Sequence, residues 1–170
     1  MAPDPAPTAL TATATATSTA RPLAEGLFTW PSDEPRLLGS RCARCGTMTF
    51  PTHYGCPRCS SEAMETVELG TRGRIWTWTS QEFRPPAPYA GPETFTPYYV
   101  GYVELPGELI VETWLTGFDR GHPEIGDEVE LAVVPFNLEG DEAVVTYAFA
   151  PVGAGDGGAA ADGDDDGCAP

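Results

Sequence analysis

The sequence predicts a mainly β protein, in which a small cysteine-rich ribbon precedes a closed barrel of five strands. Two Cys-x-x-Cys pairs lie between residues 42 and 59. Strand-like segments follow between residues 73 and 149, and no helical period separates most of them. Segments of low complexity flank this part at both ends. We therefore expect an all-β centre between two disordered tails.

The two tails have the composition of disordered segments. Residues 1–22 are mostly Ala, Thr and Pro, with few large side chains to bury, which predicts a disordered leader rather than a signal peptide. Residues 153–170 are almost entirely Gly, Ala and Asp, which predicts a disordered acidic tail. Cys168 lies in this tail, and we expect it to be free and incidental.

Large apolar side chains become frequent between the leader and the first cysteine pair. Residues 23–40 include Phe28 and Trp30, while Pro31 and Pro35 argue against a long helix. We expect this segment to be an aromatic N-terminal arm that packs against the ribbon or against a partner.

Residues 41–64 are expected to bind a metal ion. Each Cys-x-x-Cys turn places two sulfurs on one side of a tight loop, so two such turns can supply four ligands to one ion. The four ligands would be Cys42, Cys45, Cys56 and Cys59. This pattern predicts a rubredoxin-like zinc ribbon with one structural zinc, because four protein sulfurs leave no open coordination position. A rubredoxin-type iron site and a pair of disulfides are the alternatives, although no secretory signal precedes the cysteines.

Residues 65–152 are expected to form the barrel. Five segments have the alternation or composition of strands: Gly73–Phe83, Tyr98–Leu105, Leu109–Thr116, Asp127–Phe136 and Ala143–Phe149. Pro106-Gly107 should join the second and third strands in a tight hairpin, and Val129, Leu131 and Val133 should face inward. The OB-fold is the commonest small barrel of five strands.

A proline-rich loop separates the first two barrel strands. The segment Arg84–Pro97 contains five prolines together with Tyr89 and Phe95. Prolines stiffen a loop and lower the entropy lost on docking it, so the loop is a candidate contact arm. A passive connection that covers the barrel end remains equally open.

Charge argues against nucleic acid as a partner. Alternation places Trp76 and Trp78 on one face of the first strand, with Ile75, Thr77 and Thr79 on the other, and exposed tryptophans can stack on bases. However, the chain has 9 arginines, no lysine and 25 acidic residues, which give a formal net charge of -16. Such a chain repels phosphate backbones and anionic lipids. No apolar run reaches the roughly 18 residues of a membrane span, so we expect a soluble, cytoplasmic protein.

The sequence offers no candidate catalytic residues. His53 lies between the cysteine pairs and His122 lies in a polar turn, while the paired cysteines are assigned to the metal. No nucleophile elbow or phosphate-binding glycine loop is present, so the chain alone is not expected to be an enzyme. Arginines that bracket the first barrel strand are candidates for binding the phosphates of CoA, although arginines at a turn are more often solvated. They are Arg72, Arg74 and Arg84.

Short motifs stand in a characteristic order along the chain after the aromatic arm. They are Phe50-Pro51, Cys56-Pro57-Arg58-Cys59, Gly73-Arg74-Ile75-Trp76-Thr77, Val103-Glu104-Leu105 and Ile125-Gly126-Asp127-Glu128-Val129. In this order they resemble the zinc-ribbon OB-fold proteins of the domain of unknown function 35 family. The resemblance covers residues 23–152.

This resemblance implies a protein partner and an acyl-CoA substrate reached through the complex. Family members resemble accessory subunits of thiolase-fold enzymes that form or cleave C–C bonds in acyl-CoA compounds. The arm is most similar to small subunits of thiolases that act on aromatic acyl-succinyl-CoA compounds. A subunit of a steroid side-chain acyl-CoA aldolase is one alternative, and an independent acyl-CoA or nucleic-acid binding OB-fold protein is another. We expect the partner contact to use Phe28, Trp30, Tyr89 and Phe95, because aromatic side chains anchor interfaces at low entropic cost.

Overall fold

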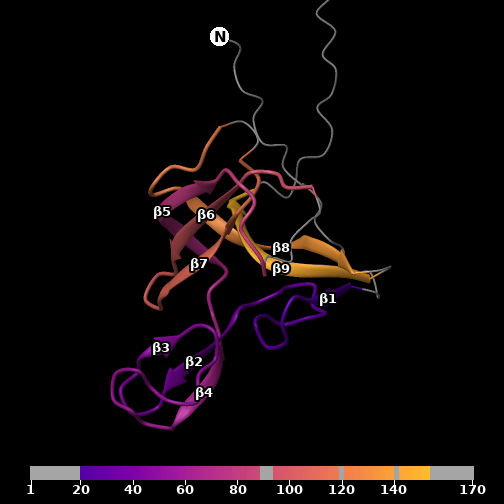
Figure 1. Ribbon diagram of the computed structural model, residues 1–170. Coiled ribbons are helices and arrows are strands. Elements are labelled where there is room, and N and C mark those ends of the chain that lie inside the picture. Colours follow the sequence, from indigo (N-terminus) through magenta and orange to yellow (C-terminus); the bar gives the residue numbers. More distant parts are fainter. Residues whose placement is uncertain (1–19, 89–93, 119–120, 140–141, 154–170) are drawn as a thin grey trace, which may run out of the picture.

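The computed structural model describes residues 20–88, 94–118, 121–139 and 142–153, so most of both expected tails lies outside the described residues. A ribbon of short strands lies at one end of the described fold and a barrel at the other (Figure 1). The ribbon strands are β2 (Leu38–Cys42), β3 (Met48–Thr49) and β4 (Met64–Glu68). The others are β1 (Ala20–Pro22), β5 (Arg72–Gln81), β6 (Tyr98–Glu104), β7 (Ile110–Leu115), β8 (Glu128–Glu139) and β9 (Glu142–Pro151). The described part contains no helix long and apolar enough to cross a membrane.

The predicted barrel of five strands is confirmed. Its hydrogen-bonded order is β9-β7-β6-β5-β8, and pairing of β8 with β9 closes the ring. All of these pairs are antiparallel except β7 with β9, which is parallel over Trp114 and Leu115. The chain therefore closes as an OB-fold, in which the third and fifth barrel strands lie side by side.

Inward-facing apolar side chains from every barrel strand fill the core. On β8, Val129 and Val133 are buried and Leu131 packs against the core, as alternation predicted. The predicted hairpin at Pro106-Gly107 is also present. Its Gly107 has a φ of 75°, a conformation that glycine adopts without strain. The Leu105 amide donates to the Leu109 carbonyl oxygen at 2.9 Å.

The prediction for the faces of the first barrel strand was wrong. The pairing of β5 with β6 shifts register between Ile75 and Thr77, so Trp76 is the extra residue of a β-bulge. A bulge interrupts the two-residue alternation, because the residues on either side of it no longer keep their expected faces. As a result, Trp76 is exposed while Trp78 packs against the core.

The aromatic arm packs against the barrel, and its first strand begins earlier than expected. Ala20–Pro22, which we assigned to the leader, pairs in parallel with the start of β9 as β1. The indole Nε1 of Trp30 donates to the Ala20 carbonyl oxygen at 2.9 Å. Phe28 forms an isolated bridge with Leu37, and both side chains belong to the same buried cluster as the barrel core.

The ribbon is larger than predicted, because β2 and β4 are its main strands. Their antiparallel register runs from Leu38↔Glu68 to Cys42↔Met64, so the ribbon sheet begins before residue 41 and ends after residue 64. A ring contact between Phe50 and Tyr147, with centroids 5.4 Å apart, joins ribbon and barrel.

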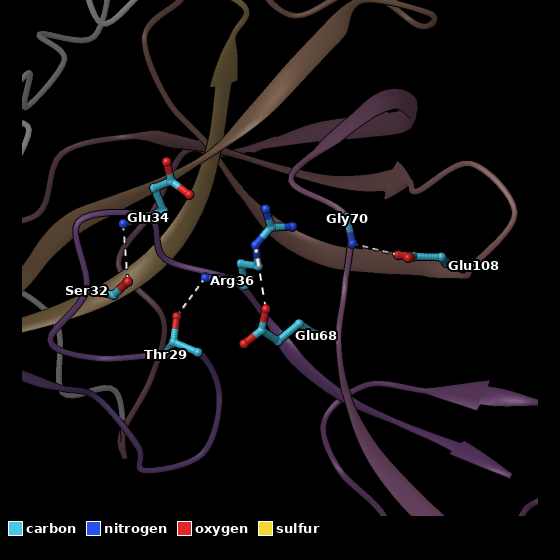
Figure 2. A network of polar contacts seen from close by, with 7 residues as sticks. All are labelled: Thr29, Ser32, Glu34, Arg36, Glu68, Gly70 and Glu108. Carbon is cyan, nitrogen blue, oxygen red and sulfur yellow. Dashed lines mark hydrogen bonds and ion pairs between the residues drawn. The ribbon is translucent and has the colours of Figure 1, made fainter. Parts of the chain in front are cut away.

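Polar contacts hold the arm and the connection between ribbon and barrel (Figure 2). The Arg36 amide donates to Thr29 Oγ1 at 2.9 Å, and the Arg36 guanidinium lies 3.6 Å from the Glu68 carboxylate. At the connection itself, the Gly70 amide donates to Glu108 Oε2 at 2.8 Å. The adjacent Leu69 is fully buried, so both polar and apolar contacts fix the connection.

Candidate metal centre

The four predicted cysteine ligands converge at one point of the ribbon. Their Sγ atoms all lie within 4.8 Å of one another. The Cys42 and Cys59 sulfurs are 3.7 Å apart, and the Cys45 and Cys56 sulfurs are 3.5 Å apart. Four sulfurs bound tetrahedrally to zinc, each about 2.3 Å from the ion, would be separated by about 3.8 Å. The observed spacing therefore fits a single zinc ion, which these four side chains hold.

Two similar loops, one for each cysteine pair, create this geometry. In the first loop the Gly46 amide donates to the Cys42 carbonyl oxygen at 2.9 Å, and in the second the Ser60 amide donates to the Cys56 carbonyl oxygen at 2.9 Å. Both donors lie just after the second cysteine of their pair and have positive φ, 73° for Gly46 and 55° for Ser60. The first loop uses the residue type that this backbone favours, whereas the second uses a serine, which the sequence alone did not single out.

The acid–base properties of the sulfurs also favour a bound cation. Hydrogen bonds from the side chain and the backbone of Thr47 lower the pKa of Cys45 to about 6. At Cys59, a hydrogen bond from the Ser61 backbone lowers the pKa, but burial and the three neighbouring sulfurs outweigh it and raise the value to about 12. The Cys59 thiol therefore keeps its proton beside the other sulfurs, and a bound divalent ion would supply the positive charge that stabilises its thiolate.

The centre is closed and structural. Cys42 and Cys56 are buried, and the other two cysteines are half-buried. Four sulfur ligands complete the tetrahedral shell, so zinc here has no free position for water or substrate. Within the described ranges, these cysteines form the one cluster of three or more side chains able to hold a metal.

Three of the four aromatic residues predicted to contact a partner are described: Phe28 and Trp30 contact each other in the arm, with ring centroids 6.1 Å apart, and Phe95 lies in the connection between β5 and β6. Phe28 is only 3% exposed and belongs to the core of this chain. Trp30 packs partly against the same core, while Phe95 is half-buried and contacts Tyr98, with ring centroids 6.0 Å apart. Tyr89 lies outside the described residues.

Two of the three candidate CoA-binding arginines already contact carboxylates. The Arg72 guanidinium lies 3.3 Å from Glu130, and that of Arg74 lies 2.8 Å from Glu128. Arg84 is exposed in the loop beyond β5. A phosphate bound at β5 would have to displace carboxylates from a strongly acidic chain, so the arrangement does not favour this site.

Sequence reasoning missed a group of outward-facing aromatic side chains on the barrel. The rings of Tyr98 on β6 and Trp114 on β7 have centroids 5.0 Å apart. The rings of Trp76 and Tyr102 also contact each other, with centroids 6.4 Å apart. The signal was present in the alternation of both strands, because Val103 and Val111 fix which positions face inward.

Comparison with known proteins assigns both halves of this fold. Residues 30–65 match the family described as "ChsH2, rubredoxin-like zinc ribbon domain", and residues 66–134 match "ChsH2, C-terminal OB-fold domain". A DUF35 domain-containing scaffold protein of Methanothermobacter thermautotrophicus is 31% identical over 135 residues, which cover 75% of this chain and 95% of that protein. The chain belongs to the DUF35 family.

Other DUF35 relatives carry names that refer to acyl-CoA enzymes. The benzoylsuccinyl-CoA thiolase subunit BbsA of Thauera aromatica is 37% identical over 99 residues, which cover 58% of this chain and 64% of that protein. A solved structure named Ltp2-ChsH2(DUF35) aldolase contains a similar chain, with a TM-score of 0.51 and 31% identity over 68% of this chain and 84% of that one.

Proposed function

We propose that this DUF35 protein is a non-catalytic accessory subunit that binds and supports a thiolase-fold enzyme acting on acyl-CoA substrates. The observation that carries the proposal is the 37% identity to a protein named as a subunit of benzoylsuccinyl-CoA thiolase. In such a pair, the thiolase-like chain supplies the catalytic residues and this chain stabilises it and helps to enclose the substrate.

The chemistry of the chain agrees with a supporting role. Its zinc is enclosed by four sulfurs and offers no position to a substrate. The outward arginines of β5 contact Glu128 and Glu130 rather than forming an open anion site. We place this role in the cytoplasm, where reducing conditions keep zinc-binding thiols from forming disulfides.

Two substrate classes are to be distinguished. The similarity to BbsA favours a thiolase acting on an aromatic acyl-succinyl-CoA compound. The similarity to the Ltp2-ChsH2 aldolase, at 31% identity, favours the alternative of an acyl-CoA aldolase of steroid side chains. The first is our preferred assignment because the identity is higher.

Co-expression with any thiolase-like protein that is encoded beside this chain tests the proposal. We expect a stable complex with two copies of each chain, measured by light scattering, and acyl-CoA cleavage only when both chains are present. Benzoylsuccinyl-CoA and a steroid side-chain hydroxyacyl-CoA are the two substrates to compare. Turnover by this chain alone would overturn the non-catalytic assignment, and failure to bind the thiolase-like chain would overturn the accessory role.

A further inference from the structure

Six outward-facing side chains form an apolar surface on one side of the barrel. Five of them alternate with core residues along β6 and β7, and the sixth is the bulged tryptophan of β5. The six are Trp76, Tyr98, Val100, Tyr102, Ile110 and Trp114, and we call them the outer aromatic face. Among the described side chains that pack against the core, none belongs to this face.

Three side chains of the outer aromatic face are largely exposed to solvent. Trp76 is 57% exposed, Tyr102 is 42% exposed and Ile110 is 43% exposed. Val100 lies directly opposite Trp114 in the pairing of β6 with β7, so the surface continues across both strands. A contiguous apolar patch of this kind marks an interaction site, because single exposed apolar residues are common but clusters are not.

The location agrees with the way in which OB-folds bind. Their ligands contact the second and third barrel strands, here β6 and β7, and the loops that join strands one to two and four to five. Phe95, in the connection from β5 to β6, extends the face by its contact with Tyr98. Phe136, near the far end of β8, stacks on Trp114 with centroids 5.3 Å apart and an interplanar angle of 29°. Aromatic contacts therefore run from one of these loops toward the other.

Charge decides which class of partner fits. On β6 and β7, the polar side chains that face outward beside the outer aromatic face are Glu104 and Glu112, and neither strand contains a basic residue. Arg72 and Arg74 of β5 also face outward here, and Arg74 lies opposite Glu104, but each arginine already contacts a carboxylate of β8, so acidic side chains outnumber basic ones on this side. A second copy of this chain would bring carboxylates against carboxylates, and nucleic acid would bring phosphates against them. A protein surface with an apolar centre and a rim of arginine or lysine is complementary to both features.

We propose that the outer aromatic face is the docking surface for the thiolase-fold partner, which contacts it through a basic-rimmed apolar surface. This inference rests on the proposed function and adds where the partner binds and what its contacting surface looks like. It places the interface on β5, β6 and β7 rather than on the arm residue Phe28, which is buried.

Binding of the purified thiolase-like protein to three forms of the full chain tests this inference. The double substitution Trp76→Ser with Tyr102→Ser removes two exposed anchors and should raise the Kd by about tenfold or more. The matched control is Tyr54→Ser, which removes an aromatic side chain that is 97% exposed at the ribbon and should leave the Kd within about twofold. Zinc content and thermal unfolding verify that each variant is folded.

Two further measurements sharpen the test. Glu104→Lys should slow association and reduce its dependence on salt, because it places a positive charge opposite the basic rim. In hydroxyl-radical footprinting, the complex should protect Trp76 and Tyr102 while Tyr54 stays reactive.

The outcomes separate this inference from the proposed function. If the intact chain binds and the double variant binds equally well, the docking surface is wrong while the accessory role stands. If Tyr54→Ser abolishes binding instead, the interface lies on the ribbon and the inference is overturned. Self-association that the double variant abolishes would identify a second copy as the occupant and overturn it too. If the intact chain does not bind any thiolase-like protein encoded beside it, the accessory role fails, and with it the assigned occupant.

Discussion

At the residue scale, the metal centre depends on each of its four sulfurs. Cys56 is 3% exposed, so replacing it with serine buries a hydroxyl that binds zinc poorly beside three thiols. We expect Cys56→Ser to lose zinc and to unfold the ribbon, because metal binding contributes roughly 10 kcal/mol or more to folding in small zinc domains. Elemental analysis and limited proteolysis measure both effects. Cys168→Ser is the control and should keep one zinc per chain; iron in the purified protein would contradict the metal assignment.

A second residue-scale prediction concerns Glu112 and two tyrosines. Tyr102 donates a hydrogen bond to Glu112 Oε2 at 3.2 Å, and this bond with the nearby negative charge raises the pKa of Tyr102. Burial, followed by the charge of Glu112, raises the pKa of Tyr147. The pKa of each tyrosine is higher in the folded state than in the unfolded state, where it is about 10. The stabilisation is therefore complete below about pH 10 and is lost as the pH rises through the folded-state pKa values.

Replacing Glu112 with glutamine removes this charge and should let both tyrosines ionise at lower pH. Ultraviolet absorbance of the phenolate during an alkaline titration measures the shift. The variant should also lose less stability than the intact chain as pH rises above about 10. An unchanged titration curve would show that Glu112 does not influence these rings.

At the element scale, the close approach of β5 and β6 requires a glycine. A Cβ atom at Gly73 would lie 2.5 Å from the Glu104 carbonyl oxygen and 2.6 Å from Val103 Cγ1. The first of these is a backbone atom, so the strands would have to separate. We expect Gly73→Ala to lower the free energy of unfolding by about 1–3 kcal/mol or more, measured by urea denaturation. Gly121→Ala is the control, because nothing lies within 4 Å of its added Cβ and its effect should be small.

Sequence patterns predicted the barrel strands well, but they failed where pairing rather than composition decides. Alternation placed Val129 and Val133 inward correctly because β8 is regular there. It failed at Trp76, since a bulge depends on the register with β6 and leaves no local mark in the sequence. Alternation also predicted that this strand ends at Phe136, whereas the pairing of β8 with β9 continues to Glu139 across a second irregularity in register.

At the scale of the whole molecule, ribbon, arm and barrel share one core. The buried cluster joins Phe28 of the arm and Leu69 of the connection to barrel residues such as Phe149. The four tryptophans lie in the arm and the barrel, and residues 38–68 contain none. Tryptophan fluorescence therefore reports on the parts of the chain that do not bind zinc.

This separation allows a test of coupling between the two parts. We expect a chelator that removes zinc to lower the temperature at which tryptophan fluorescence changes, because losing the ribbon exposes the shared core at Leu69 and Phe50. Restoring zinc should reverse the shift. A fluorescence transition that does not move when zinc is removed would show that ribbon and barrel unfold independently.

The metal centre could be predicted from sequence because both cysteine pairs are local motifs. The ion pairs of Arg72 and Arg74 could not be predicted from sequence, because their carboxylate partners lie 58 and 54 residues away along the chain. Alternation indicates which side chains of β6 and β7 face outward, but it could not predict the outer aromatic face as one surface. Its members belong to three strands, and only the register of those strands shows that they share a surface.

The parallel pairing of Ala20–Pro22 with β9 has a practical consequence for handling the protein. β7 pairs with β9 only at Ala148 and Phe149, and β1 pairs with β9 at Ala143, Val144 and Val145. Ala143 is the first residue of an uncharged run, AVVTYAF, whose composition is typical of segments prone to amyloid-like stacking. Composition alone would suggest removing the first 22 residues, and we expect a chain shortened in this way to aggregate on storage. A chain shortened by 19 residues keeps β1 and should stay in solution. Thioflavin fluorescence and sedimentation measure the difference between the two chains.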